Sequence, residues 1–363
     1  MVKALIFGYF GVINLGDEAI LYKLYNDISD IGVKDITIIT KNVKYTKSKY
    51  DCTIIDIRNL PKLVMEILKC NVIIDGGGGR NYNIHKGIFY ILLITIFAKI
   101  FKKSMITYAI GVDNIKKSLN RKLVSYVYNY YEYINVRDTY SKKNLEQCNI
   151  KKRIIVTSDP VFNISLSKKE DNYIIKEIGN FKSSKKMIGV SFVNVNNSRY
   201  NEIKKYYCDI IGVCIENGYK VLIIPMAPGE GDLDSLEKIE FEISNKEMLK
   251  IIYDEIDITI LNEIFKMVDL SIGMRLHFLI FSAINKVPFA SIIRNDKVRY
   301  ITDYFKQKTI CYIDQPSIEN IRININQFLN NNNYIDIDLL NNIRKVESSN
   351  SMMLRSFIEN IMQ

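Results

Sequence analysis

Short apolar runs alternate along this chain with longer segments in which apolar residues recur every three or four positions. The short runs predict β-strands, and the longer segments predict helices. Regular alternation of the two is typical of a mostly parallel sheet with helices on both faces. In the first half of the chain the predicted strands are residues 3–8, 35–40, 52–57, 71–75, 104–110, 133–136 and 153–157. The predicted helices between them are residues 17–29, 61–69, 85–101, 119–131 and 141–148.

A polar stretch at residues 165–186 interrupts the alternation. We interpret it as a connection between two domains, with room for a short helix of its own. Beyond it, strands are predicted at residues 187–193, 220–224, 268–272, 288–293 and 309–313, and helices at residues 200–217, 233–243, 259–267, 275–285 and 297–305. The sequence therefore predicts an α/β protein with two doubly wound Rossmann-like domains, residues 1–164 and 187–330. A helical tail, residues 331–363, has the length to pack back on the first domain.

The positive net charge of the chain indicates which classes of partner it could bind. Lys and Arg number 50 and Asp and Glu 40, so the net charge is +10. Such an excess favours phosphorylated substrates, an acidic membrane surface or nucleic acid. No run of five basic residues and no Arg-rich arm is present, so nucleic acid is the least favoured of the three and is not expected as a partner.

The cysteines and histidines argue against metal chemistry. The six cysteines form no CxxC pair, and the chain has only two histidines, so a zinc site is not expected. Most cysteines lie in apolar stretches, which favours buried, reduced thiols. The N-terminus lacks the layout of a signal peptide. Together these features predict a cytoplasmic protein.

One apolar run raises the question of a membrane. Residues 87–98 are almost wholly apolar, and Lys99, Lys102 and Lys103 follow closely. A spanning helix needs about 20 apolar residues, so this run is too short and a buried core helix is favoured. The alternative is a helix that lies on the inner membrane surface with its lysines toward anionic lipid.

Two glycine-rich segments follow predicted strands. Ligands of parallel sheets bind beyond the carboxyl ends of the strands, so both segments are candidate binding loops. In the segment 8–18, three glycines permit a tight turn and a close approach to a ligand, and Asn14 and Asp17 suit a sugar hydroxyl. The alternative role for Asp17 is a helix N-cap. In the segment 75–81, four consecutive glycines precede Arg80, which could hold an anion, and Asn81, which could hold a hydroxyl.

The segment 268–277 is the most informative in the chain. It predicts a buried strand, a turn at Gly273, and the first turn of a helix that carries Arg275 and His277. A helix N-terminus offers unpaired N–H groups, and a guanidinium and an imidazole beside it suit anion binding and proton transfer. The alternative is a basic pair that caps a carboxylate from elsewhere. Further cations follow strands at Arg294, Lys297 and Arg137, although Arg137 and Asp138 could simply form a cap and its ion pair.

These segments, in this order, resemble the motifs of the polysaccharide pyruvyl transferase family, which includes cell-wall enzymes of the CsaB type. The matching segments are residues 8–18, 75–79, 136–138 with Ser141, 158–160, and 268–277 continuing to Pro288. The resemblance implies transfer of pyruvate from phosphoenolpyruvate to a saccharide, with a cyclic ketal formed across two hydroxyls and phosphate released. It also implies a GT-B-like fold, in which an acceptor-side domain and a donor-side domain face each other across a cleft. Phosphoenolpyruvate is then a co-substrate, and no cofactor or metal is expected.

The resemblance assigns a role to His277, and the needs of the reaction suggest roles for other residues. His277 matches the family's catalytic acid and is the natural group to protonate the methylene carbon of the donor. A base for the hydroxyl is Asp17, with Asp75 as the other possibility. The expected donor-binding residues are Arg275, Gly273, Arg294, Lys297 and Arg137. The expected acceptor-binding residues are Asn14, Gly11, Gly16, Asp75, Gly77, Gly78, Arg80 and Asn81.

The chain departs from the family pattern at two places in the donor region. Asn194 stands where an Arg is expected, and Asn295-Asp296-Lys297 stands where Asp-Pro-Lys is expected. Two other functions fit the same fold, because a fold alone does not fix a reaction. One is a nucleotide-sugar-dependent glycosyltransferase, and the other is a non-catalytic saccharide-binding protein. The acceptor sugar, whether it is lipid-linked, and the oligomeric state are left open by the sequence.

Overall fold

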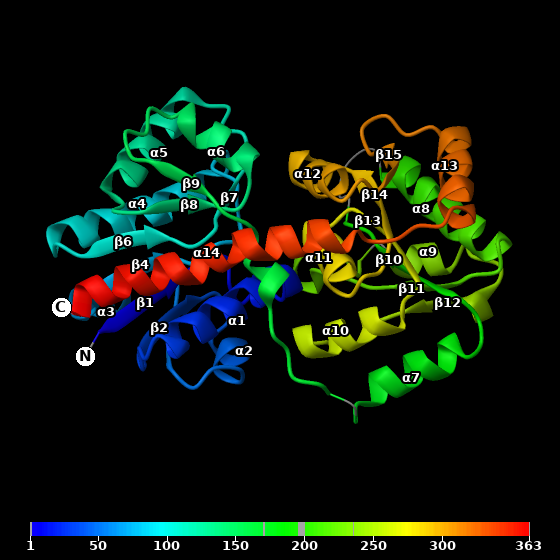
Figure 1. Ribbon diagram of the computed structural model, residues 1–363, viewed down its shortest axis with the longest axis horizontal. Helices are drawn as coiled ribbons and strands as arrows, with labels where there is room; N and C mark the ends of the chain where they lie inside the picture. Colours follow the sequence, from blue (N-terminus) through cyan, green and yellow to red (C-terminus); the bar gives the residue numbers. More distant parts are fainter. Residues whose placement is uncertain (1, 170, 195–199, 235, 363) are drawn as a thin grey trace. The chain divides into compact units, whose positions relative to one another are not determined.

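The chain divides into two α/β units (Figure 1). The computed structural model describes residues 2–169, 171–194, 200–234 and 236–362, so Glu170 of the predicted connection and Ser235 of the predicted helix 233–243 lie outside it. The first unit holds Met1–Val12, Asp17–Ile164 and Ile343–Gln363, and the second holds Ile13–Gly16 and Ser165–Asn342. The chain therefore enters each unit more than once.

The first unit is built on a parallel sheet with the strand order β3-β2-β1-β4-β6. Its strands are β1 (Lys3–Phe7), β2 (Asp35–Thr40), β3 (Thr53–Asp56), β4 (Val72–Asp75) and β6 (Ser104–Thr107). Two further parallel pairs are β5 (Gly79–Arg80) with β7 (Gly111–Val112), and β8 (Ile134–Val136) with β9 (Ile154–Val156). The order reverses between β1 and β4, which defines the switch point of this sheet.

The second unit holds a six-stranded parallel sheet with the order β12-β11-β10-β13-β14-β15. Its strands are β10 (Met187–Ser191), β11 (Lys220–Ile223), β12 (Leu249–Ile251), β13 (Leu270–Gly273), β14 (Phe289–Ile293) and β15 (Lys308–Tyr312). Renumbered along the chain this is the order 3-2-1-4-5-6 of a doubly wound Rossmann fold. The predicted fold class is therefore confirmed, with the switch point between β10 and β13.

Helices connect the strands, and side-chain caps fix where many of them begin. In the first half they are α1 (Leu15–Asp30), α2 (Val43–Lys47), α3 (Leu60–Lys69), α4 (His85–Ile100), α5 (Ser118–Tyr130), α6 (Thr139–Glu146) and the short η1 (Pro160–Asn163). In the second half they are α7 (Tyr173–Lys182), α8 (Tyr200–Glu216), η2 (Pro228–Glu230), α9 (Leu236–Glu240), η3 (Lys246–Met248), α10 (Ile258–Met267), α11 (Leu276–Ile284), α12 (Asp296–Tyr304), α13 (Ile318–Asn330) and α14 (Ile337–Met362). Asn59, Asp138 and Asp257 each accept a backbone N–H at a helix start, as N-caps do.

Alternation along β1 divides the core of the first unit between the two faces of its sheet. Leu5 and Phe7 pack with the buried sides of α3, α4 and α5. Ala4 and Ile6 point the other way and pack with α1 and with the end of α14. The C-terminal helix thus covers one face of the N-terminal sheet (Figure 1).

The core of the second unit is equally layered. Ile188 and Val190 of β10 pack with α8 and α13, which lie against each other. Elsewhere in the unit the ring of Phe265 in α10 packs against Phe278 and Phe281 of α11, with centroids 5.2 and 5.9 Å apart. These rings hold the apolar helix α11 firmly behind β13.

Most predicted elements are present, with a few informative differences. The predicted strand 104–110 ends at Thr107, and Ala109, at a φ of 49°, turns the chain out of the strand conformation. The sequence reading missed α2, β12 and α13. The polar stretch 165–186 carries a short helix, as the sequence allowed: α7 packs on α10, and Lys182 Nζ donates to the Met267 carbonyl at 2.6 Å.

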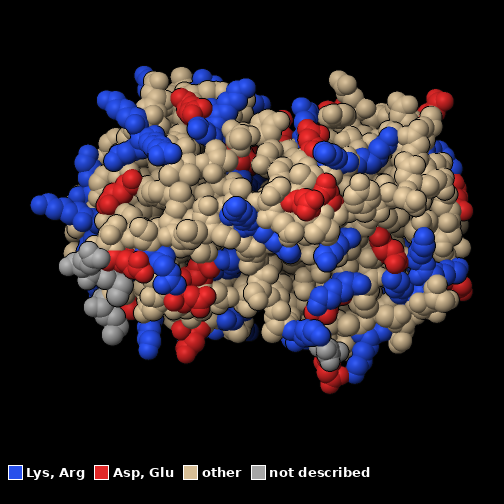
Figure 2. All heavy atoms as spheres, in the orientation of Figure 1, with Lys and Arg blue, Asp and Glu red and all other residues tan. Residues whose placement is uncertain are grey.

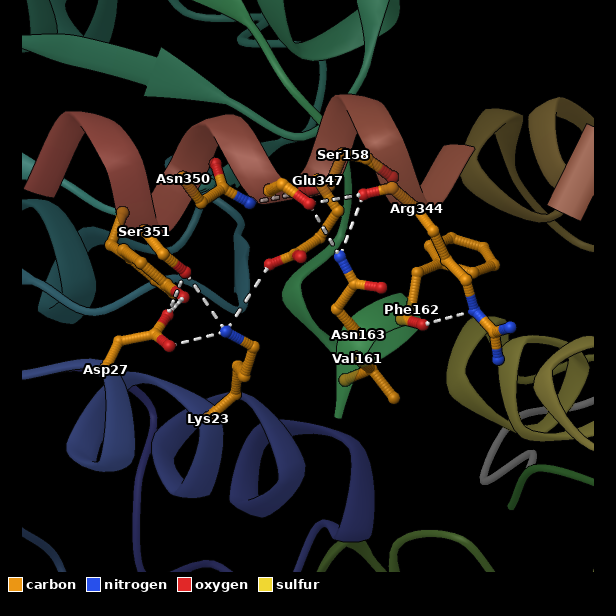
Figure 3. Close-up of polar contacts among 12 residues, drawn as sticks. Lys23, Asp27, Ser158, Val161, Phe162, Asn163, Arg344, Glu347, Asn350 and Ser351 are labelled. Carbon is orange, nitrogen blue, oxygen red and sulfur yellow. Dashed lines mark hydrogen bonds and ion pairs between the residues drawn. The ribbon is translucent and has the colours of Figure 1, made fainter. Parts of the chain in front are cut away.

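Polar contacts fasten α14 to α1 and η1 within the first unit (Figure 3). Asn350 Nδ2 donates to the Ser158 carbonyl at 2.9 Å, and Asn163 Nδ2 donates to the Arg344 carbonyl at 2.8 Å. Ser351 donates to Asp27, which also pairs with Lys23. These contacts join segments more than 180 residues apart in the sequence.

Glu347 lies in the middle of this contact with its side chain fully buried. Its nearest charge is the Lys23 ammonium at 3.9 Å, and among the described residues neither carboxyl oxygen has a hydrogen-bond partner. Burial penalises the charged form more than Lys23 favours it, and raises the pKa of Glu347 to about 7. The folded protein therefore holds a proton on Glu347 at pH values where the unfolded chain has lost it.

This proton makes stability depend on pH. A raised carboxyl pKa stabilises the fold at low pH, and that stabilisation falls as pH rises from about 4.5 to about 7. Glu347→Gln, which mimics the protonated form, is expected to raise the melting temperature at about pH 8 and to flatten its pH dependence. The exposed Glu359→Gln on the same helix should behave as the parent does. A Glu347→Gln protein with an unchanged melting profile would contradict the buried, protonated state.

Candidate functional site

The segment that carries His277 lies at the switch point of the second unit. β13 ends at Gly273, β10 lies beside it, and α11 begins at Leu276. A side chain added at Gly273 would collide with the ring of Phe278, 2.3 Å away, so only glycine allows this tight turn from strand to helix. His277 is the second residue of α11 and is partly exposed. Ligands of doubly wound sheets bind at this position, which makes it the candidate site.

The glycine-rich segment near the N-terminus contributes to this same site. Residues Ile13–Gly16 belong to the second unit. The Leu15 amide donates to the Met226 carbonyl at 2.8 Å, and Asn14 Nδ2 donates to Glu230 Oε1 at 2.9 Å. A Cβ at Gly16 would lie 2.0 Å from His277 Nδ1, so the bare backbone of Gly16 packs directly on the imidazole.

Arg275, predicted to bind the donor, is held by two carboxylates. Its guanidinium donates to Asp232 through Nε at 3.2 Å and through a second nitrogen at 2.5 Å, and to Glu230 at 2.7 Å. Asp232 is buried, and burial raises its pKa despite Arg275. The charge of Arg275 is therefore already matched inside the protein. This corresponds to the alternative reading of the motif, a basic residue that pairs with a carboxylate from elsewhere.

Arg294 is the more available cation of this region. It follows β14 and is exposed. Desolvation and then the nearby Arg275 guanidinium lower its pKa. Within residues 2–169, 171–194, 200–234 and 236–362, no carboxylate forms an ion pair with Arg294. Lys297 lies in the first turn of α12 and is partly exposed.

The two departures from the family pattern have structural roles in the second unit. Asn295 caps α12, because its side chain accepts from the Val298 amide at 3.1 Å. Asn194 Nδ2 donates to Asp234 Oδ2 at 3.4 Å, and a Cβ on Gly231 would lie 2.7 Å from that nitrogen. Both asparagines thus hold the loops that surround Arg294 and Arg275.

In the first unit, the glycine-rich loops pack around Asp17 and Glu18. Gly77 and Gly78 both have positive φ, and a Cβ on Gly78 would lie 2.5 Å from Asp17 Oδ1. Gly11 also has positive φ, and its amide donates to Glu18 Oε1 at 3.0 Å. Asp17 is not an N-cap, because α1 begins at Leu15 and Asn14 accepts from the Gly16 amide. The buried Asp17 carboxylate therefore lies at the carboxyl end of β4.

Arg137 lies in the first unit within a buried cluster of carboxylates. Its guanidinium donates to Asp159 at 2.9 Å and lies 3.6 Å from Asp138, while Asp138 also caps α6. Burial lowers the pKa of Arg137, but Asp159, Asp138 and Asp17 outweigh it and raise the pKa. The guanidinium also packs on Gly111, where a Cβ would meet it at 2.5 Å. Arg137 thus acts as a fixed countercharge for the acidic side chains around it.

Asp75 and Arg80, predicted to bind the acceptor, pair with each other inside the first unit. Asp75 is fully buried, forms an ion pair with Arg80, and accepts from Tyr131 at 3.4 Å. Burial raises the pKa of Asp75 in spite of this pairing. Asn81 is exposed and accepts from the Asn83 amide in a turn. Asp75 and Arg80 therefore stabilise the loop that holds Gly77 and Gly78.

Sequence reasoning missed the carboxylates that organise the second unit. Glu230 and Asp232 lie on both sides of Gly231, whose φ of 84° suits glycine alone. The available signal was an acidic pair in a Gly- and Pro-rich stretch after a strand, the position where binding residues gather. Among the residues that the structure describes, no group of three or more His, Cys, Asp and Glu side chains is placed to hold a metal ion.

The contact of Gly16 with His277 gives a direct test. Gly16→Ala places a methyl group where the imidazole lies, so it is expected to shift the His277 resonances in a proton–carbon NMR spectrum, which contains only two histidines. Gly212→Ala in α8 meets nothing within 4 Å and serves as the control. If Gly16→Ala leaves both histidine spectra unchanged, the packing is wrong.

The two arginines of the second unit should differ in their effect on stability. Arg275→Gln leaves the buried Asp232 without its countercharge and is expected to destabilise the second unit by ~3 kcal/mol. Arg294→Gln removes an exposed charge and should stay within about 0.5 kcal/mol of the parent. Thermal unfolding of both variants compares them directly, and equal losses would refute the assignment of Arg275 as the structural partner.

Known structures resemble this chain in fold. UDP-GlcNAc 2-epimerase of Methanocaldococcus jannaschii, solved with UDP-GlcNAc and UDP, is 16% identical over 96% of this chain and 100% of its own, with a TM-score of 0.63. HepE of Anabaena, solved with UDP and glucose, is 9% identical over 99% of both chains, with a TM-score of 0.63. E. coli ADP-heptose LPS heptosyltransferase II is 12% identical over 90% and 98%, with a TM-score of 0.50. The fold is therefore GT-B-like.

Sequence comparison identifies the family. No curated protein matches the chain at a significant level. A family model described as polysaccharide pyruvyl transferase, however, matches residues 14–297. The match spans the Asn14–Gly16 segment, the glycine-rich loop after β4 and the His277 segment, and it confirms the resemblance seen in the motifs. This chain belongs to the polysaccharide pyruvyl transferase family.

Proposed function

We propose that this protein transfers pyruvate from phosphoenolpyruvate to a saccharide, forms a cyclic ketal across two hydroxyls, and releases phosphate. The observation that carries the proposal is the family match over residues 14–297. The position of His277 supports it, because an imidazole at a helix start beyond β13 is placed where a doubly wound sheet binds its ligand.

The reaction needs one proton donor and one path for a leaving phosphate. A general acid adds a proton to the methylene carbon of phosphoenolpyruvate, and the adjacent carbon becomes an oxocarbenium-like centre. One sugar hydroxyl adds to that carbon, and a second hydroxyl then replaces the phosphate and closes the ketal. The two hydroxyls lose one proton each. One of these replaces the proton that the acid gave to the methylene carbon, and the other leaves with phosphate or passes to solvent.

His277 is the proposed general acid, since imidazole changes its charge near neutral pH. The residue is partly exposed, and its ring packs on Gly16, so the backbone fixes the orientation of the imidazole. Asp17, buried at the end of β4 in the first unit, is the proposed base for a hydroxyl. For the phosphate and carboxylate of the donor, Arg294 is the preferred cation and Lys297 the second, because Arg275 is matched by Glu230 and Asp232. No cofactor or metal is needed for this chemistry.

Phosphate release tests the reaction and the role of His277 together. With phosphoenolpyruvate and a panel of hexose and N-acetylhexosamine acceptors, acceptor-dependent phosphate release is expected. His277→Ala should keep the fold and lower this rate by about 10²–10⁴-fold, the range of general acid catalysis. His85→Ala, which removes the other histidine, should retain activity. A folded His277→Ala protein with full activity would exclude His277 as the acid.

Arg294 can be tested separately from catalysis. Arg294→Gln is expected to raise KM for phosphoenolpyruvate about tenfold or more with a smaller change in kcat, since a lost charge-assisted hydrogen bond weakens donor binding. The control is Arg58→Gln, which changes an exposed arginine in the same way. Arg137 is not used for this purpose because it is buried. An unchanged KM in Arg294→Gln would assign donor binding to other residues.

The similarity in fold to structures solved with UDP is the reason to test a second function, that of a nucleotide-sugar glycosyltransferase. A nucleotide-sugar glycosyltransferase on this scaffold would bind a uridine or guanosine diphosphate, and titration calorimetry distinguishes the two functions. Nucleotide binding without phosphoenolpyruvate binding would favour the glycosyltransferase. Binding of phosphoenolpyruvate and saccharide without turnover would indicate a non-catalytic saccharide-binding protein.

A further inference from the structure

Helix α4 has an apolar stripe on its outer side as well as on its buried side. Ile88, Ile91 and Ile94 enter the core of the first unit. Phe89 and Ile100, by contrast, are 53% and 62% exposed. Together with Ile96, 38% exposed, and the half-buried Leu93, they follow the spacing i, i+4, i+7 and i+11 of one helix face. An ordinary surface helix carries polar residues at these positions, so this exposed apolar stripe is unusual.

Neighbouring helices extend the apolar surface. The α5 helix packs against α4 and presents exposed Leu119 and Tyr126 at the same i, i+7 spacing. Lys99 Nζ lies over the ring of Tyr126, 5.3 Å from its centroid, so the outer faces of α4 and α5 meet. On the other side of α4 packs α3, which exposes Met65 and Leu68. We call these outward-facing side chains of the three helices the α3–α5 face.

The charge around α4 and α5 is mostly positive. Residues 76–131 contain nine Lys and Arg residues and a single acidic residue, Asp113. Lys99, Lys102 and Lys122 are exposed beside the apolar stripe. In the part of the chain that the structure describes, no carboxylate forms an ion pair with any of these three lysines. Figure 2 shows Lys and Arg gathered over the region of α4, α5 and α6, with few acidic side chains between them.

We propose that the α3–α5 face docks on the surface of an anionic lipid bilayer. Apolar side chains with lysines beside them and few carboxylates are the pattern of helices that lie in a membrane interface. The apolar side chains would enter the boundary between headgroups and acyl chains, while the lysine ammonium groups reach the lipid phosphates. Docking differs from spanning, and among the described residues no helix is long and apolar enough to cross a bilayer.

The partner is a lipid surface and not a second protein, because of the unmatched charge. A protein partner, including a second copy of this chain, would have to supply a large excess of acidic groups to face these lysines. This chain carries a net charge of +10, so two copies would repel each other across the face. The phosphates of an anionic bilayer supply negative charge across the whole surface, so they can pair with all of these lysines.

Vesicle sedimentation tests the proposal with the full-length protein. Binding is expected to vesicles of phosphatidylcholine mixed with phosphatidylglycerol, to weaken with added salt, and to be much weaker with phosphatidylcholine alone. The variant Lys99→Glu/Lys102→Glu/Lys122→Glu should bind about 100-fold more weakly, since each lysine near an anionic surface contributes roughly fivefold. Ile96→Ser/Ile100→Ser, which keeps the charge, should also weaken binding.

Matched controls separate the face from general effects. Lys34→Glu/Lys44→Glu/Lys47→Glu changes three exposed lysines elsewhere by the same charge, and Phe241→Ser/Tyr334→Ser removes two exposed aromatic side chains elsewhere. Both should bind as the parent does, and unfolding curves check that every variant is folded. The proposal is overturned if the parent does not bind, if the two lysine triples lose binding equally, or if Ile96→Ser/Ile100→Ser abolishes self-association instead of vesicle binding.

Discussion

The guanidinium of Arg275 lies between Asp232 and Glu230, and the rest of the site in the second unit depends on this cluster. Glu230 uses its other oxygen to hold Asn14, which is 2.9 Å away, and Asn14 accepts from the amide of Gly16. Gly16 in turn packs on the His277 ring. The Arg275–Glu230 ion pair thus fixes a loop that is distant in sequence, and through that loop it orients the imidazole of His277. Breaking the neighbouring Arg275–Asp232 pair is costly because it leaves the buried Asp232 charge unmatched.

Because of this cluster, Arg275 and Arg294 have different roles, although they are neighbours. Arg275 is saturated by carboxylates of its own chain, whereas Arg294 is exposed and lies close enough for Arg275 to lower its pKa. The first unit follows the same logic, because Arg137 is enclosed by Asp159 and Asp138. An arginine near a binding loop can therefore be part of the scaffold, and its burial and partners distinguish the two roles.

The sequence was sufficient to place most of the strands and to predict the two Rossmann-like halves, because buried parallel strands are short apolar runs and parallel sheets gather their loops at one edge. The sequence was not sufficient to predict which acidic and basic side chains form ion pairs with each other. Asp75 and Arg80 were expected to face a ligand, but they are five residues apart across a turn and pair in the core. Glu230 and Asp232 were overlooked because their partner is more than forty residues away. β12 was missed because it is only three residues long. α13 was missed because it is rich in Asn and other polar residues.

The placement of α14 has a consequence for how the protein is made. Leu354 and Ile358 cover the face of the first sheet formed by Ala4 and Ile6, although they are synthesised some 350 residues later. The second unit, apart from the short Ile13–Gly16 segment, is one continuous stretch that leaves the ribosome before α14 is complete. The first sheet to be translated is thus the last to be closed, and until then its apolar face must be shielded by α1 alone or by a chaperone.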